Sequence, residues 1–306
     1  MLHLLIGTDW TRNRDAILAR LADDVHTRRE GRILMVPELI SHETERALCR
    51  FAGDTASRYA EVLSFTRLAR RAAEQAGSSA MECLDSGGRV VAMAAAARQL
   101  ASKLKAYAAV ETKPEFLTEL IDAVDEFKRC CITAQDLKVA AAQTEGSLAQ
   151  KLEELSLLME SYDALCSQGK RDPRDQMTWL LEQLEESDYA QTHVFYIDGF
   201  PDYTRQHLEI LEHLIQFSPS VTVSLNCDSI GSRQLAFEKA GQTASEIYRA
   251  AQRLNIPVQV ELIPGREDAL SPMRERLFQG AIQIGSCAGC LDTAQADSPW
   301  AEVMAS

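Results

Sequence analysis

One aspartate at the end of an apolar run could take part in nucleotide hydrolysis. The segment 194–200 reads Val-Phe-Tyr-Ile-Asp-Gly-Phe, and its first four residues have the continuous apolar character of a buried strand. Asp198 follows directly, at the end where α/β folds place carboxylates that meet a ligand. In an ATPase such an aspartate holds magnesium and a following glutamate polarises water, but here Gly199 follows. The segment therefore predicts an ATPase frame that lacks one catalytic group.

The turn after the first predicted strand stands where a phosphate-binding loop would be. In the working motif, G-x-x-x-x-G-K-[ST], backbone amides wrap the phosphates, the lysine neutralises their charge and the hydroxyl holds magnesium. Gly7 matches the first position, but Arg12, Asn13 and Arg14 replace the second glycine, the lysine and the hydroxyl residue. Either arginine could meet an anion at a helix N-terminus, although an ordinary strand-to-helix turn is favoured. We predict a degenerate nucleotide site comprising Gly7, Arg12, Asn13, Arg14 and Asp198, while noting that Asp-Gly is also a common turn.

These residues need a parallel sheet to position them, and the sequence predicts one. Short apolar strands are expected at 2–6, 33–36, 61–65, 193–198, 221–225 and 257–263, and helical patterns follow most of them. Strands that are apolar throughout and alternate with helices indicate a parallel sheet covered on both faces.

The middle of the chain has a different character. From about 78 to 187 strand signals vanish, and helices are expected at 85–109, 114–129, 133–142, 146–168 and 173–186. The predicted organisation is a first part of a sheet lobe over 1–77, a helical insertion over 78–187 and a second part of the lobe over 188–265. Residues 266–306 are expected to be a linker or the truncated start of a next lobe.

Composition narrows the classes of protein. A chain of 306 residues with 46% hydrophobic and 25% charged residues is typical of globular proteins. The net charge of −13 disfavours a stand-alone nucleic-acid binder, because phosphate contacts require an excess of Lys and Arg. No apolar run reaches the roughly 18 residues of a membrane span, and no secretory signal begins the chain. Eight scattered cysteines are typical of reduced thiols, so a cytoplasmic location and no membrane partner are expected.

One pair of cysteines has metal-ligand spacing. Cys287 and Cys290 form the chain's only Cys-x-x-Cys, whereas a zinc ribbon needs a second pair. We therefore expect two free thiols in a loop and predict no metal site.

Several segments, in order, resemble one family. They are Ile33–Leu39 ("LVPEQ" in the family), Val62–Arg70 ("V-x-SF-S/T-RLA-x-R"), Glu126–Leu137 ("EFKR…SPEDL"), Tyr196–Thr204 ("YIDGF-x-x-FT") and the strand Val221–Leu225. The order of these segments is similar to that in the N-terminal region of the B subunit of ATP-dependent helicase/deoxyribonucleases, the AddB/RexB family.

The resemblance implies a RecA-like fold, the first lobe of a superfamily 1 helicase, with an inserted all-helical subdomain. It implies that the lobe is a relic that binds single-stranded DNA in the 3'-strand channel and helps recognise the Chi sequence, while the partner, the A subunit (a helicase-nuclease), unwinds DNA. Full-length members are far longer and hold an iron–sulfur cluster in a C-terminal nuclease domain that nothing here resembles. We therefore predict no cofactor in this chain, and do not expect ATP with magnesium to bind.

By this resemblance, the ends of the second and third strands contact DNA. The candidates are Ser64, Phe65, Thr66 and Arg67, since an aromatic ring can stack on a base while hydroxyl and guanidinium groups meet phosphate. For Phe65, simple core packing is an equal alternative. The leading hypothesis is a non-catalytic module that binds DNA and a partner subunit. The alternatives are a nucleotide-binding or ATPase lobe with an atypical phosphate site, and a purely structural lobe.

Overall fold

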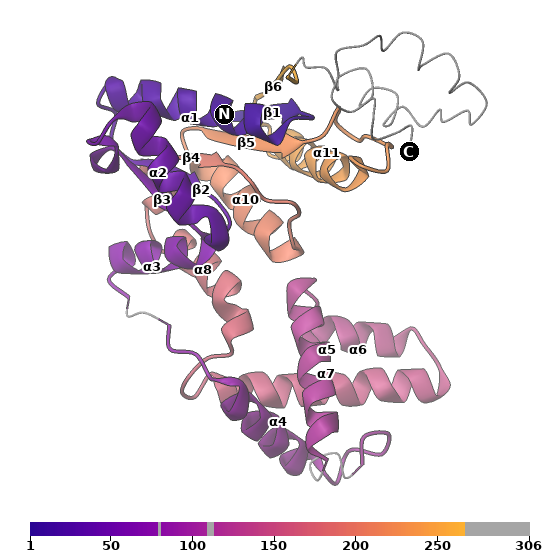
Figure 1. Cartoon of the computed structure of the whole chain (residues 1–306). Helices are drawn as coiled ribbons and strands as arrows, with labels where there is room; N and C mark the ends of the chain where they lie inside the picture. Colours follow the sequence, from indigo (N-terminus) through magenta and orange to yellow (C-terminus); the bar gives the residue numbers. More distant parts are fainter. Residues whose placement is uncertain (79–80, 109–112, 267–306) are drawn as a thin grey trace, which may run out of the picture.

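A six-stranded, all-parallel sheet forms the centre of the protein. The computed structural model describes residues 1–78, 81–108 and 113–266. The strands are β1 (Leu2–Gly7), β2 (Arg32–Met35), β3 (Ala60–Leu63), β4 (Val194–Ile197), β5 (Val221–Asn226) and β6 (Val258–Leu262), in the spatial order β3-β2-β4-β5-β1-β6 (Figure 1). This arrangement confirms the predicted α/β, RecA-like fold.

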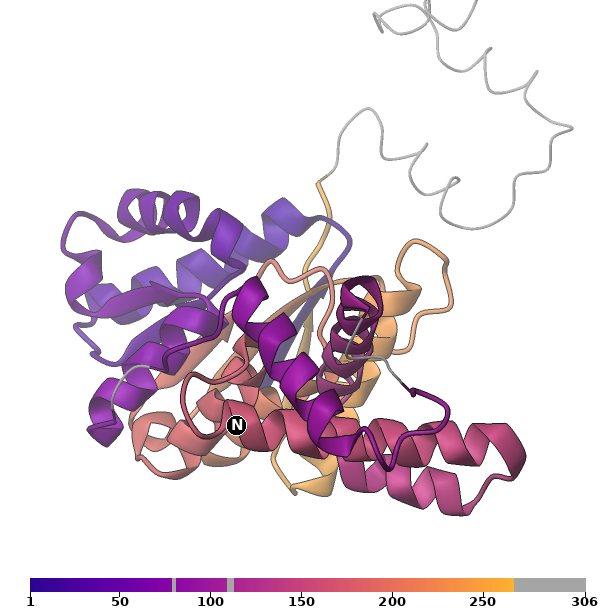
Figure 2. The same cartoon turned by 90° about the horizontal axis from the view of Figure 1, so that it is seen from below.

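Helices cover both faces of the sheet, as parallel strands require. On one face lie α1 (Trp10–His26) and α2 (Ser41–Ala52), and on the other lie α3 (Phe65–Ala76), α8 (Gln176–Glu185), α10 (Arg205–Phe217) and α11 (Glu238–Arg253). Side chains alternate between two apolar cores along each strand. In β1, for example, Leu4 packs with α10 and α11, whereas Leu5 packs with α1. Figure 2 shows α1 and α2 together on one flank of the lobe.

Four helices form a separate subdomain that lies to one side of the sheet lobe (Figure 1). They are α4 (Ser86–Leu100), α5 (Pro114–Arg129), α6 (Ala134–Ala142) and α7 (Gly146–Cys166), and they share a core of their own. The expected helix 85–109 ends early, at Leu100. Short helical segments also lie in the described connections: η1 (Glu38–Ile40), η2 (Ala56–Arg58), η4 (Pro173–Asp175) and α9 (Tyr189–Thr192).

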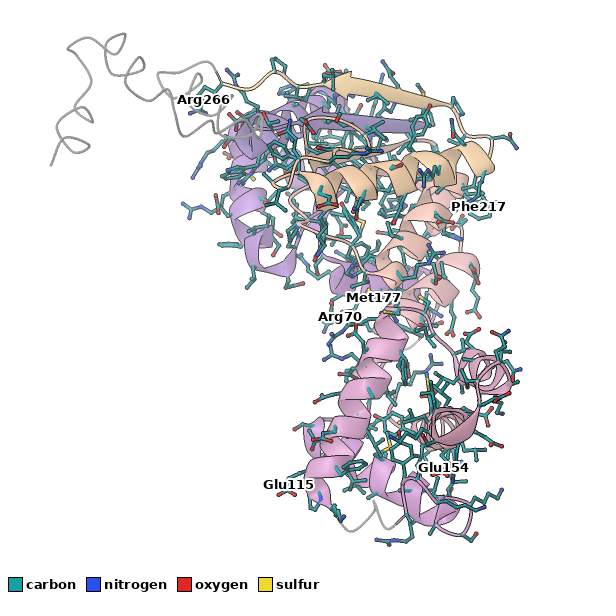
Figure 3. The ribbon with its side chains drawn as sticks, turned by 90° about the vertical axis from the view of Figure 1, so that its right-hand side faces the viewer. Arg70, Glu115, Glu154, Met177, Phe217 and Arg266 are labelled. Atoms are coloured by element: carbon teal, nitrogen blue, oxygen red, sulfur yellow. The ribbon has the colours of Figure 1, made fainter. Side chains whose placement is uncertain are left out.

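The last helix expected in the insertion belongs, by its packing, with the sheet. Trp179, Leu180 and Leu184 of α8 are buried in the same core as β4 and α10, and α8 packs closely on α3. Met177, at the start of α8, lies at the junction of lobe and subdomain (Figure 3). Sequence does not distinguish an apolar face that meets the lobe from one that meets α4–α7, since both have helical spacing.

Capping residues set several helix boundaries. Ser64 accepts a hydrogen bond from the Arg67 amide (3.3 Å) and begins α3, so β3 ends at Leu63 rather than at the expected residue 65. Thr133 and Asp136 form a reciprocal capping box at the start of α6. Within the described part of the chain, no helix is both long and apolar enough to cross a membrane.

Candidate functional site at the carboxyl edge of the sheet

The carboxyl ends of β1, β4 and β5 bring the predicted nucleotide-site residues to one edge of the sheet. Gly7 pairs with Asn226 of β5, and Ile197, the last residue of β4, pairs with Val223. Asp198 therefore follows β4 beside Ser224 of β5. This is the edge where open parallel sheets bind ligands.

Asn13, in the first turn of α1, lies buried behind the turn that follows β1. Its side chain is 2% exposed, and Nδ2 donates to the carbonyl oxygens of Gly7 (3.0 Å) and Leu225 (3.2 Å). A Cβ on Gly7 would lie 2.3 Å from Asn13 Oδ1, so only glycine fits against this amide. Where a lysine would reach out to phosphates, the amide instead points inward and joins α1 to two strands.

Asp9 was not among the predicted site residues, yet it caps the N-terminus of α1 at this loop. Its carboxylate accepts hydrogen bonds from the backbone amides of Thr11 (3.0 Å) and Arg12 (3.4 Å) at the start of α1. These amides are the donors that a phosphate would use at a helix N-terminus. The sequence carries a signal for this contact, because aspartate directly before a helix is a preferred N-cap.

Asp198 is enclosed rather than open to a ligand. It is 7% exposed and accepts a hydrogen bond from the Ser224 hydroxyl. Burial raises the pKa of its carboxyl group, although Ser224 and the positive charge of Arg14 oppose that shift. Arg14 lies 3.5 Å from Glu43, whereas Arg12 points into solvent. The structure thus gathers Gly7, Asn13, Arg14 and Asp198 but not Arg12.

The prediction of no metal site concerns both the described residues and the Cys287–Cys290 pair. Among the described residues, no group of His, Cys, Asp or Glu could hold a metal ion. Cys287 and Cys290 lie outside those residues.

Phe65, for which core packing was an equal alternative, lies in the core. It is 5% exposed, stacks on His207 (centroids 4.3 Å apart, planes at 14°) and meets Phe200 edge-to-face at 5.2 Å. Because Phe65 is the first residue of α3, its side chain turns under the helix, toward α10. Its faces are covered in this arrangement, so the core-packing alternative describes it.

The other three DNA candidates differ in how far they reach the surface. Ser64 is buried, and its hydroxyl donates to the Glu38 carboxylate, which ties the ends of β2 and β3 together. Thr66 and Arg67 are half-buried. The Arg67 guanidinium pairs with Glu45 at 3.1 Å. Beside Glu38, Leu39 is 98% exposed, an apolar side chain that the sequence did not single out.

Comparison with known sequences settles the family. A sequence model of the family described as "ADDB, N-terminal" matches residues 4–274. The chain belongs to this family.

Several curated relatives, each named as the B subunit of an ATP-dependent helicase/deoxyribonuclease, are similar to it. A protein from Thermoanaerobacter sp. (strain X514) is 33% identical over 199 residues, which is 64% of this chain and 17% of the relative. One from Clostridium tetani is 28% identical over 82% of this chain and 23% of the relative. One from Bacillus velezensis is 25% identical over 86% and 24%, respectively. The chain thus spans about a fifth of the length of these AddB-family relatives.

Proposed function

We propose that this domain is a non-catalytic, helicase-like part of a double-strand-break repair helicase–nuclease. In this role it binds single-stranded DNA of the Chi type and contacts the partner, the A subunit of the complex. The observation that carries the non-catalytic part is the Asn13 amide, which fills the phosphate loop where a lysine is needed. The relatives are named as one subunit of an enzyme, which supports a partner within a complex.

The side chains at the carboxyl edge of the sheet support a lobe that does not hydrolyse nucleotide. Phosphoryl transfer requires cations that neutralise developing charge and a group that positions water. Here the Asp9 carboxylate already accepts the α1 amides, and Asp198 is buried against Ser224. Gly199, which follows Asp198, has no side chain that could polarise water.

The ends of β2 and β3 support a DNA-binding edge. The Ser64–Glu38 hydrogen bond holds the two strand ends side by side, and Thr66 and Arg67 reach the surface next to them. Arg67 can meet a phosphate, and the exposed Leu39 can pack on a base. The Arg67–Glu45 pair is half-exposed and therefore weak enough to exchange for a phosphate.

A titration of labelled single-stranded oligonucleotide tests the DNA part, with and without the partner subunit. Arg67→Ala is expected to weaken binding and to reduce the salt dependence by about one phosphate contact. Arg98→Ala is the matched control, because Arg98 is an exposed residue of α4 in the subdomain. An Arg67→Ala variant that binds DNA as tightly as Arg98→Ala would contradict the assignment of this edge. If no DNA binds even in the assembled complex, the remaining hypothesis is a purely structural lobe.

A second titration, with ATP and magnesium, tests the loss of nucleotide chemistry. The Asn13 amide and the Asp9 carboxylate together predict no magnesium-dependent binding in the micromolar range. Binding in that range would instead support the atypical nucleotide site.

A further inference from the structure

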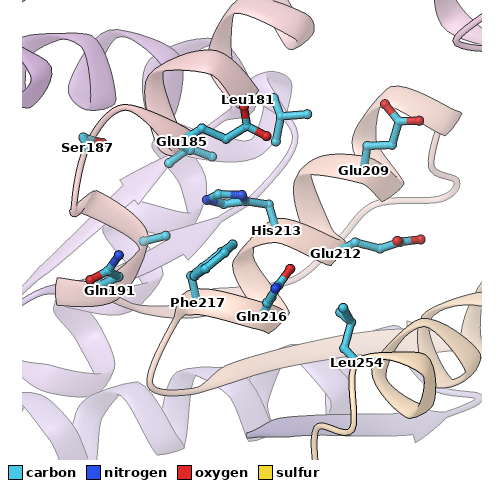
Figure 4. A pocket seen from close by; sticks show the side chains of 12 residues that line it. Leu181, Glu185, Ser187, Gln191, Glu209, Glu212, His213, Gln216, Phe217 and Leu254 are labelled. Atoms are coloured by element: carbon cyan, nitrogen blue, oxygen red, sulfur yellow. The ribbon is translucent and has the colours of Figure 1, made fainter.

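A hollow lies between α8, α9 and α10, away from the edge just described. Its volume is about 460 Å³ (Figure 4). The hollow reaches Phe217, the last residue of α10, which precedes β5 by a short connection, so this end of the hollow lies at the amino edge of the sheet. A ligand here would not compete with one at the carboxyl edge.

The floor of the hollow is apolar. Leu181 and Leu184 of α8 line it together with Phe217 and Leu254. Phe217 is 42% exposed, and its ring leans on His213 with centroids 4.6 Å apart. Solvent-exposed aromatic side chains beside leucines are often buried when a protein partner binds.

The rim of the hollow is acidic. Glu185, Glu209 and Glu212 line it, and no lysine or arginine among the described residues does. Glu185 is exposed, whereas Glu212 lies 3.1 Å from Arg253. Glu209 lies 3.5 Å from Arg205 and accepts a hydrogen bond from the Cys131 thiol.

The imidazole at the centre adds no compensating charge. Burial lowers the pKa of His213, while the Glu185 carboxylate and the Leu184 carbonyl oppose that shift without cancelling it. His213 is therefore mostly neutral at pH 7. At that pH the imidazole therefore does not compensate the Glu185 carboxylate, which makes no ion pair within the described structure.

We propose that this hollow is a docking groove for a basic amphipathic helix of a partner polypeptide. Leucine side chains of such a helix would cover Phe217 and Leu181, and flanking arginines would meet Glu185 and Glu212. The acidic rim repels nucleic acid and disfavours a second copy of this chain, whose net charge is −13. The groove deepens the partner-contact part of the proposed function and rests on it, but is independent of the DNA part.

Binding of a designed peptide tests the groove. The probe is a labelled helix of about 15 residues, built from leucine, alanine and arginine with leucines at positions i, i+3, i+4 and i+7. A matched peptide carries glutamate in place of arginine. The full 306-residue chain should bind the arginine peptide and not the glutamate peptide.

Paired variants separate groove binding from general charge attraction. Glu185→Lys and Phe217→Ala should each weaken binding roughly tenfold. Glu119→Lys, at an exposed α5 residue that makes no ion pair within the described structure, changes the net charge equally and should leave binding intact. The proposal would be overturned if Glu185→Lys and Glu119→Lys bound the arginine peptide equally well, or if the chain did not bind that peptide. Single-stranded DNA binding should be unchanged in Phe217→Ala, so failure of the groove and failure of the DNA assignment are distinguishable.

Discussion

The sheet lobe and the helical subdomain are held together by different forces. The lobe buries two continuous apolar layers, one on each face of the sheet. The subdomain has one smaller apolar core, and beside it lies a cluster of charged side chains that is almost fully buried. Apolar burial tolerates small rearrangements, whereas a buried charge needs its partner in place. The subdomain should therefore be the part that a single polar change can break.

The buried cluster joins helices that are far apart in sequence. Asp172, which is fully buried, accepts a hydrogen bond from the Tyr162 hydroxyl (2.6 Å) and from Arg89 (3.1 Å). Arg89 also pairs with Asp125, which in turn lies 2.8 Å from Arg174. These contacts link α4, α5 and α7 to the chain segment that leads back to the lobe.

A second polar contact orders the same subdomain. Glu154 of α7 accepts hydrogen bonds from the backbone amides of Lys105, Ala106 and Tyr107 at 3.0–3.1 Å (Figure 3). Burial opposes ionisation of this carboxyl group, but the amides lower its pKa below the usual range. The turn after α4 is thus fixed by one carboxylate.

Asp172→Ala should have the largest effect, a loss of about 3–5 kcal/mol, because it leaves Arg89 buried without one of its partners. Urea unfolding and amide hydrogen exchange would show the loss concentrated in α4, α5 and α7. Asp122→Ala, at an exposed residue of α5, is the control and should change stability by less than about 0.5 kcal/mol. Loss of protection spread evenly over the lobe would show that the two regions do not differ as described.

Leu214→Ala should destabilise the sheet lobe and leave the helical subdomain unaffected. Leu214 of α10 is fully buried in the lobe core, so the cavity costs about 2–4 kcal/mol. The same hydrogen-exchange experiment should place this loss in the sheet and α10. Leu235→Ala, which removes an exposed leucine, should have almost no effect.

Asn13→Ala should cost about 1–3 kcal/mol, because the carbonyl oxygens of Gly7 and Leu225 lose their donor. The expected readout is a lower midpoint of thermal unfolding with no change in single-stranded DNA binding. A change in DNA affinity without a change in stability would give Asn13 a ligand-contacting role instead.

His207→Gln should have the smallest effect, a change in the pH dependence of stability beside the loss of the ring contact with Phe65. Burial lowers the pKa of His207 below 6.5, opposed by Asp202, so between the lowered value and 6.5 the unfolded state binds more protons. Stability should therefore fall as pH drops through this window, and Gln should remove part of that fall. Like His207, Gln can accept a hydrogen bond from the Thr204 amide at the start of α10, so stability at pH 7.5 measures the pH-independent loss of the Phe65 contact. An unchanged pH slope would contradict the role of burial.

The two regions also differ in how well the sequence predicts them. Strands such as β2 and β4 can be located because continuous apolar runs of this length are typical of buried parallel strands. The expected bounds of α5 hold because Pro114 marks its first turn. By contrast, nothing in the sequence brings Arg89, Asp125 and Asp172 together, since charged residues on predicted helices usually face solvent.

At the candidate site, the sequence identifies the missing groups but not what replaces them. The absence of the loop lysine is visible, but the inward hydrogen bonds of Asn13 depend on how closely β1 and β5 approach α1. The covering of Phe65 likewise depends on His207 and Phe200, which are distant from it in sequence. Such contacts belong to tertiary structure and leave no local pattern.

The Asp9 carboxylate already accepts hydrogen bonds from the backbone amides that an anion would need at this loop. Because the Asp9 carboxylate lies in the same chain, two and three residues before these amides, it competes with any incoming anion at a high effective concentration. Restoring lysine at position 13 alone should therefore not restore phosphate binding, because the donors would still be taken. A working phosphate loop at this position would require several coordinated changes, among them one that adds the cation and one that removes the built-in anion.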